Sequence, residues 1–447
     1  MLQGCFIMAT NTPENTGNNG GYSRKDFLAL TGKTLAAGAV GSVLVSDATA
    51  QSVTSQGSTE RKPAHQDEPI VLEKWKSEVD QASGPTPTPL APDQRVGYAV
   101  VGLGHLALEN ILPAITACKK SKLVALVSGS PEKMRKVAAQ YGVTPQNCYS
   151  YQTYDQLKNN KEVEVIYIVL PNGLHKEYVI RGAKAGKHIL CEKPMAISSA
   201  ECKEMIAACN QAGVKLMVAY RIQYQPHHRK LREMVQQKTF GEPKLIEASN
   251  CQSSTNPEHW RHKKALAGGG ALPDIGLYCL NTVRFVLNAE PTEVFAYGYS
   301  TPGNPLFREV EELVSWQMKF ANGLIANCTT NYNVHESRRY RVLCEKGWLS
   351  VDKAFAYKGQ KLMSAKADGK LELQQDIGLT EKDQFATEMD YFSHCVIYNK
   401  KPFTPGEEGL QDHLIMEAIY KSAEEGRPVK LTSLLPAGYK GVEPESD

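Results

Sequence analysis

The chain has 447 residues, more than one hydrophobic core normally organises, so its length indicates two domains with additional segments. Hydrophobic residues make up 42% and charged residues 22%, a composition typical of globular proteins. The formal net charge of +3 is too small to favour nucleic acid or a membrane surface as a partner. The 11 cysteines include no Cys-x-x-Cys pair, which disfavours both a disulfide framework and a zinc site.

Residues 1–50 have the features of an export signal. Arg24 and Lys25 precede a weakly apolar run to about Val45, and Ala-Thr-Ala at 48–50 is a small-x-small cleavage pattern. This apolar run is too short to cross a bilayer core of roughly 30 Å. The segment resembles a twin-arginine signal in which Lys25 replaces the second arginine, and an ordinary Sec signal or a disordered tail is the alternative. We expect export to a bacterial periplasm.

Residues 51–92 are rich in Ser, Thr, Gln and Pro, and "GPTPTPLAP" (84–92) predicts an extended, polyproline-like chain. This segment is either a plain linker or an arm that lies on another surface.

A dinucleotide-binding motif follows a short β-rich run, Val96–Val101. The sequence "GLGHLA" (102–107) has the form G-x-G-x-x-A and is followed by an apparent helix. Gly102 permits a tight turn, Gly104 lets a pyrophosphate approach the backbone, and Ala107 allows close packing of helix against strand. The helix N-terminus would add N–H donors and a positive dipole end.

Further strands and helices extend this pattern and predict a Rossmann domain over residues 93–215. A second strand is expected at 123–129, a buried parallel strand at 164–171, a helix at 199–213 and a last strand at 214–221.

The end of the second predicted strand favours NADP over NAD. An NAD site usually places an acidic residue there to bind the ribose 2′-hydroxyl, but this chain reads "SGSPEK" (128–133). Glu132 lies beyond Pro131 in the next predicted helix, whereas Ser128 can donate to a phosphate and Lys133 can neutralise one. The alternative is that Lys133 is a solvated helix residue.

Asn172 and His175 follow the carboxyl end of the predicted strand at 164–171, the sheet edge at which ligands bind in such folds. A single histidine at this place is also compatible with a capping or packing role.

Four motifs together resemble the glucose-fructose oxidoreductase, inositol dehydrogenase and MocA (Gfo/Idh/MocA) family. They are "GLGHLA" (102–107), "LPNGLH" (170–175), "CEKP" (191–194) and "AGGGALPDIGLYCLNTVRFVL" (267–287). The resemblance runs from about residue 94 to about 430 and is strongest to the glucose-fructose oxidoreductase type. It implies a second α/β domain, residues 216–447, that is built on a large, mostly antiparallel sheet and carries the substrate and oligomer contacts.

The resemblance also implies the catalytic residues. Lys193 would point at the reacting centre beside the nicotinamide, next to a cis bond to Pro194. Asp274 and Tyr278 would share one helix face, with Tyr278 where most of the family has His. A free tyrosine ionises near pH 10, so the Lys193 ammonium would be needed to favour the phenolate. Tyr278 would then accept and donate the proton, Lys193 would bind the substrate oxygen, and Asp274 would hold the sugar and orient the pair. In isolation, Asp274 could equally be a helix cap and Tyr278 a core aromatic.

The predicted cofactor-binding residues are drawn from these motifs and from positions that match the family, and no metal ligand is predicted. They are Gly102, Leu103, Gly104, His105, Ala107, Ser128, Gly129, Lys133, Tyr151, Leu170, Asn172, His175, Glu192, Lys193, Arg221, Trp260 and Arg261.

The expected function is that of a periplasmic, NADP-dependent sugar oxidoreductase. It would oxidise an aldose to its lactone and reduce a ketose or aldose in a ping-pong cycle with tightly bound NADP. The alternatives are a dehydrogenase or reductase with exchangeable cofactor, and a non-catalytic sensor on the same fold. The resemblance further implies a homo-oligomer, dimer or tetramer, in which the arm covers the adenine side of the site. Small sugars are the expected partners, with neither nucleic acid nor membrane.

Overall fold

The computed structural model describes residues 89–432, 434–436 and 438–444. The predicted export signal and residues 51–88 of the predicted arm lie outside the described residues. Among the residues described, no helix combines the length and apolarity needed to cross a lipid bilayer.

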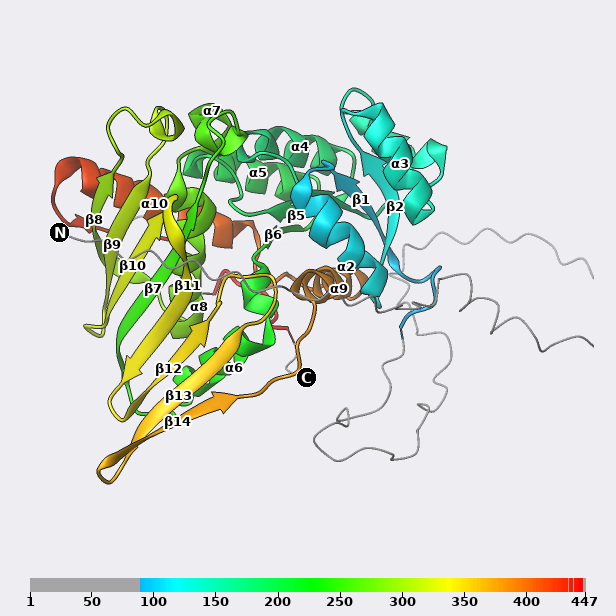
Figure 1. The fold of residues 1–447 in the computed structure, drawn as a ribbon. Helices are drawn as coiled ribbons and strands as arrows, with labels where there is room; N and C mark the ends of the chain where they lie inside the picture. The colour runs from blue at the N-terminus through cyan, green and yellow to red at the C-terminus, as the bar shows by residue number, and fades with distance from the viewer. Residues whose placement is uncertain (1–88, 433, 437, 445–447) are drawn as a thin grey trace, which may run out of the picture. The chain divides into compact units, whose positions relative to one another are not determined.

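The first sheet has six parallel strands in the order β3-β2-β1-β4-β5-β6 (Figure 1). Chain order reverses between the neighbours β1 and β4, and this switch point is where doubly wound folds bind their ligands. The strands are β1 (Val96–Val101), β2 (Ser121–Val127), β3 (Cys148–Tyr149), β4 (Val165–Ile168), β5 (His188–Glu192) and β6 (Leu216–Ala219).

Strands β1 and β4 are wholly buried, as the apolar runs predict for parallel strands covered on both faces. The connecting helices are α2 (Leu112–Ala117), α3 (Pro131–Tyr141), α4 (Asn172–Lys184) and α5 (Ser199–Gln211). The Rossmann-type fold predicted from the sequence is therefore confirmed. The boundary predicted after residue 215 falls too early, because β6 pairs with β5 and is still part of this sheet.

The second sheet has nine strands in the order β14-β13-β12-β11-β7-β10-β9-β8-β15. Only the β7 and β10 pair of this sheet is parallel, so the large, mostly antiparallel sheet is confirmed. Its strands are β7 (Pro243–Ser253), β8 (Pro291–Tyr299), β9 (Leu313–Phe320), β10 (Ile325–Asn331), β11 (Asn333–Cys344), β12 (Gly347–Asp352), β13 (Lys361–Asp368), β14 (Leu371–Ile377) and β15 (Val429–Lys430).

Helices α6 (Pro226–Gln236), α8 (Leu277–Leu287) and α10 (Gly406–Glu425) pack against one face of this sheet (Figure 1). Side chains alternate between the faces of a strand, so the residues of β8 that do not face the helices point the other way. Tyr297 and Tyr299 of β8 are exposed. Helix α9 (Gln384–Ile397) instead returns to the first sheet, where the Tyr98 hydroxyl donates to the Met389 carbonyl over 2.9 Å.

Candidate active site

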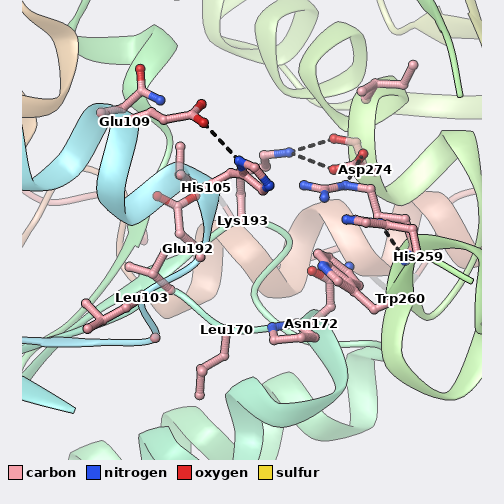
Figure 2. Close-up of a pocket in the computed structure, with 18 of the residues that line it drawn as sticks. Leu103, His105, Glu109, Leu170, Asn172, Glu192, Lys193, His259, Trp260 and Asp274 are labelled. Carbon is pink, nitrogen blue, oxygen red and sulfur yellow. Dashed lines mark hydrogen bonds and ion pairs between the residues drawn. The ribbon is translucent and has the colours of Figure 1, made fainter. Parts of the chain in front are cut away.

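A cavity of about 860 Å³ lies at the carboxyl ends of the parallel strands and reaches the second sheet (Figure 2). Residues at the ends of β1, β2, β4 and β5 line one side of it, and the segment after β6 adds Arg221. The other side comes from the end of β7, the 3-10 turn Trp260–His262, and the helical segment that contains Asp274 and Tyr278.

The glycine loop after β1 fits a dinucleotide. Gly102 has a φ of +95°, and a Cβ there would lie 2.3 Å from the Val169 carbonyl oxygen, so only glycine is accommodated. A Cβ on Gly104 would meet nothing within 4 Å, which leaves that side of the loop open to the cavity. The helical segment after the loop begins at His105, so its free N–H groups lie where a pyrophosphate would bind.

The end of β2 and the first turn of α3 place a hydroxyl and an ammonium group beside this loop. Ser128 is buried, and its hydroxyl accepts a hydrogen bond from the Ser130 amide over 3.2 Å. The Lys133 ammonium donates to the Leu103 carbonyl over 3.2 Å, which fixes its charge next to the glycine loop. Both side chains line the cavity, and no acidic residue takes the position after β2.

Lys193 follows directly on β5, and the Lys193–Pro194 peptide bond is cis. The Lys193 ammonium donates to the Asp274 backbone carbonyl over 2.7 Å and lies 3.4 Å from the Asp274 carboxylate (Figure 2). Burial opposes the charge of Lys193, but the neighbouring Tyr278 and Asp274 outweigh it and raise the pKa of the lysine. Lys193 is therefore a charged donor at neutral pH.

Asp274 lies in a π-helical turn, Leu272–Gly276, that leads into α8. Its carboxylate accepts hydrogen bonds from Arg261 Nε over 2.9 Å and from the Tyr332 hydroxyl over 2.5 Å. Burial would favour the neutral acid, but Arg261 and Lys193 hold the pKa of Asp274 well below its usual range. The site thus contains one carboxylate held by two cations and a phenol.

Tyr278 is in contact with two cations in different ways. The Lys193 ammonium lies 4.4 Å from the centre of the Tyr278 ring, so it faces the ring. At the hydroxyl the cation is Arg221, whose Nε donates to the Tyr278 oxygen over 3.2 Å. The structure therefore brings Lys193 and Tyr278 together but gives the hydrogen bond at the phenol oxygen to Arg221.

All of the predicted site residues line the cavity except Ala107 and His175. Ala107 is buried where the helical segment packs on the sheet. His175 is also fully buried, with Nε2 2.8 Å from the Leu170 carbonyl and Nδ1 3.0 Å from the Pro194 carbonyl. Burial lowers the pKa of His175. His175 thus lies behind the cavity wall and supports the Leu170 and Pro194 segments, which excludes direct contact with a ligand in the cavity.

Several residues that line the cavity lie outside the sequence motifs. Asn250 and Gln252 come from β7, Arg338 from β11, and Tyr357 from the loop between β12 and β13. Tyr332, just after β10, reaches Asp274 from behind. These side chains belong to strands and loops of ordinary composition, so only the fold brings them to the site.

Comparison with known proteins places the whole arrangement in one family. Residues 96–220 match the family described as "Oxidoreductase family, NAD-binding Rossmann fold", and residues 228–350 match the Gfo/Idh/MocA C-terminal domain. The chain belongs to the Gfo/Idh/MocA family. Its oxidoreductase class and its dinucleotide-binding fold follow from this membership.

Relatives within the Gfo/Idh/MocA family include sugar oxidoreductases. D-xylose 1-dehydrogenase [NADP(+)] of Haloarcula marismortui is 31% identical over 346 residues, 76% of this chain and 94% of that protein. 1,5-anhydro-D-fructose reductase of Ensifer adhaerens is 27% identical, over 75% and 98% of the two chains. Among solved structures, aldose-aldose oxidoreductase from Caulobacter crescentus, complexed with glycerol, is 40% identical with a TM-score of 0.73. That match covers 75% of this chain and all of the other.

Proposed function

We propose that this protein oxidises an aldose to its lactone and passes the hydride to a second sugar, an aldose or a ketose. The observation that carries the proposal is the contact of Lys193 with both Asp274 and Tyr278 inside a cavity that also contains the glycine loop. The 40% identity to an aldose-aldose oxidoreductase favours a reaction between two sugars.

The chain supplies the acid–base and binding groups for both half reactions. When bound, the nicotinamide provides the acceptor and then the donor of the hydride. As the sugar C–H bond breaks, Tyr278 takes the proton of the hydroxyl and the carbon becomes a carbonyl. Lys193 donates a hydrogen bond to the sugar oxygen, and Asp274 holds Lys193 in place. In the second half reaction Tyr278 returns a proton to the oxygen of the reduced sugar.

NADP is the proposed cofactor, held through both half reactions. Ser128, just after β2, and Lys133, in the first turn of α3, can bind a 2′-phosphate, and the acidic residue of an NAD site is missing after β2. A D-xylose dehydrogenase among the relatives carries NADP(+) in its name. Retention of the cofactor suits an exported enzyme, since no pool of free NADP is available in a periplasm.

We further propose that the protein is exported to the periplasm and acts as a homo-oligomer on small sugars, without nucleic acid or membrane as partner. The signal-like residues 1–50 support export. The exposed Tyr297 and Tyr299, on the face of the second sheet opposite its helices, support a contact with a second copy.

The test is to purify the protein without added nucleotide and to identify any nucleotide released on denaturation. We expect NADP in the purified protein, and formation of lactone and polyol from two sugars, such as glucose and fructose, without added cofactor. The names of the D-xylose dehydrogenase relatives favour a plain dehydrogenase as the second candidate. A protein that is isolated empty and turns over only with added nucleotide would support that candidate and reject sugar-to-sugar transfer.

A further inference from the structure

Arg221 is a buried cation at the edge of the candidate active site. It begins the 3-10 turn Arg221–Tyr224, directly after β6, and only 4% of its surface is exposed. Its guanidinium lies 4.8 Å from the centre of the Tyr278 ring and 4.7 Å from that of Tyr357. Burial of a charge is unfavourable in free energy, so the position of this cation requires an explanation.

The protein itself occupies most of the donors of Arg221. Nη2 donates to the Phe355 carbonyl over 2.7 Å, while Nη1 donates to Gln384 Oε1 over 2.5 Å and to the Ala356 carbonyl over 3.3 Å. Nε donates to the Tyr278 hydroxyl over 3.2 Å. An arginine has five N–H donors, and four are used here, which leaves little capacity for a ligand.

Every hydrogen-bond partner of Arg221 is a neutral group. Within the described part of the chain, no carboxylate lies at ion-pair distance from its guanidinium. The acids that sense its charge, Glu192 and Glu388, are buried, and burial raises the pKa of both. The positive charge of Arg221 is therefore not cancelled by a direct partner.

The other titratable groups that face Tyr278 come from three elements. Lys193, after β5, faces the ring, and Asp274 precedes Tyr278 in the same helical segment. Tyr357, from the loop after β12, is close enough for the two phenols to interact, and burial raises the pKa of Tyr357. Lys193 and Arg221 are thus both close to Tyr278, but the hydrogen bond to the phenol oxygen comes from Arg221.

We propose that Arg221 is a positioning residue that aims the Tyr278 oxygen and favours its phenolate, the form that accepts the proton from the sugar. The inference rests on the proposed function, and it replaces the cofactor contact predicted for Arg221 with an action through Tyr278. A hydrogen bond from a cation is stronger to a phenolate than to a phenol, so the charged form gains more from Arg221.

The experiment compares Arg221→Met with Arg221→Lys in the intact protein that carries its cofactor. The aldose alone is added at a series of pH values, and the appearance of reduced nicotinamide is followed by absorbance in a single turnover. We expect the rate to fall at low pH, where the group that accepts the proton from the sugar already carries one. In Arg221→Met this fall should move to higher pH, with a loss of roughly tenfold or more near neutral pH. Arg221→Lys keeps a charge and should recover most of the rate.

Gln384→Met is the matched control, because it removes a hydrogen bond of Arg221 but leaves the charge in place. Its pH profile should keep the position of the wild type. If the rate of Arg221→Met is lower at all pH values but its pH profile is not shifted, Arg221 has only a structural role, and the proposal is overturned. If Arg221→Met does not fold, the lysine variant decides the question. A folded Arg221→Lys protein with a low single-turnover rate, while Gln384→Met keeps a high rate, would also overturn the proposal.

Tyr278→Phe separates this inference from the proposed function. If the phenylalanine variant keeps its cofactor and loses turnover, Tyr278 is the proton acceptor, and an unmoved profile in Arg221→Met then rejects only the role of Arg221. If Tyr278→Phe turns over like the wild type, the proposed mechanism itself fails.

Discussion

Asp274 joins groups from distant parts of the chain into one charged cluster. Lys193 comes from the end of β5, Arg261 from the turn after β7, and Tyr332 from the end of β10, and all three lie within hydrogen-bonding or ion-pair distance of one carboxylate. Such a buried cluster stabilises the fold only while every member is present, because a lone buried charge is costly. In the proposed reaction, this cluster would help to fix the direction of the Lys193 ammonium.

Replacement of Asp274 by Asn should lower both activity and stability. The amide cannot balance the charges of Lys193 and Arg261, so the pKa of Lys193 should fall, and Lys193 should keep only its hydrogen bond to the backbone carbonyl of residue 274. We expect kcat to fall by about 100-fold or more, and the free energy of unfolding to fall by roughly 3 kcal/mol. Steady-state kinetics and chemical denaturation measure these two effects.

Tyr332→Phe is the control for this change, since it removes one hydrogen bond to Asp274 and leaves both cations paired. Tyr332→Phe should lower the free energy of unfolding by about 1–3 kcal/mol and keep most of the activity. An Asp274→Asn protein that matches Tyr332→Phe in kcat would show that the charge of Asp274 is not needed.

At the scale of elements, the glycine loop between β1 and the following helical segment is the most constrained part of the site. Gly102 combines a left-handed φ with a close approach of the Val169 carbonyl. Gly102→Ala should therefore displace the loop and abolish cofactor retention, which the nucleotide content of the purified protein measures. Gly142, at the end of α3, has a φ of +72° but open space around it. Gly142→Ala should lower the free energy of unfolding by only about 1 kcal/mol and should retain the cofactor. Equal loss of nucleotide in both variants would contradict a specific role of Gly102 in cofactor binding.

Most elements of the fold were predictable from the sequence, because their patterns are local. The glycine motif with its flanking strands, the late helix α10, and strands β8 to β12 all have clear periodicity or turn residues. The segment "CEKG", residues 344–347, resembles "CEKP" but lacks its proline, and it forms the turn between β11 and β12. Strand β7 is difficult to recognise in the sequence because its apolar residues alternate only weakly, and the π-helical turn at Leu272–Gly276 has no distinctive sequence pattern.

The candidate site was less predictable than the fold. The EKP and DxGxY motifs identified Lys193, Asp274 and Tyr278, but no local pattern could place Tyr332 behind Asp274 or the Arg221 guanidinium at the Tyr278 hydroxyl. Both contacts join residues more than 50 positions apart. They depend on how the two sheets meet, which only the assembled structure reveals.

At the scale of the molecule, the C-terminal helices tie the two sheets together. Arg284 of α8 is fully buried and forms ion pairs with Glu408 and Asp412 of α10. Helix α10 also reaches the EKP segment, where the Ala196 amide donates to His413 Nε2 over 3.4 Å. The relative position of Lys193 and Tyr278 therefore depends on buried polar contacts far from the cavity, and a change of pH that disturbs these contacts should act on the whole protein.

Buried histidines, among them His228 and His413, should make the protein less stable as the pH falls below neutrality. Burial lowers the pKa of His228 to about 3 and that of His413 to about 4, whereas an unfolded histidine has a pKa of about 6.5. The unfolded state therefore binds more protons in this range, and stability that is complete above pH 6.5 is lost as the pH falls toward 4. By pH 5 each histidine should cost on the order of 2 kcal/mol.

Denaturant unfolding of the intact protein at pH 7, 6 and 5 measures this loss. The Asp412 carboxyl, whose pKa is raised to about 7 by burial, also takes up a proton in the folded protein over this range, so the contribution of one histidine is read from the difference between the wild type and a variant. His228→Gln keeps a donor for the Ala354 carbonyl, which His228 contacts over 2.9 Å, but it cannot titrate. This variant should start less stable at pH 7 and lose about 2 kcal/mol less than the wild type on going to pH 5. An equal loss in both proteins would assign the acid sensitivity to other groups.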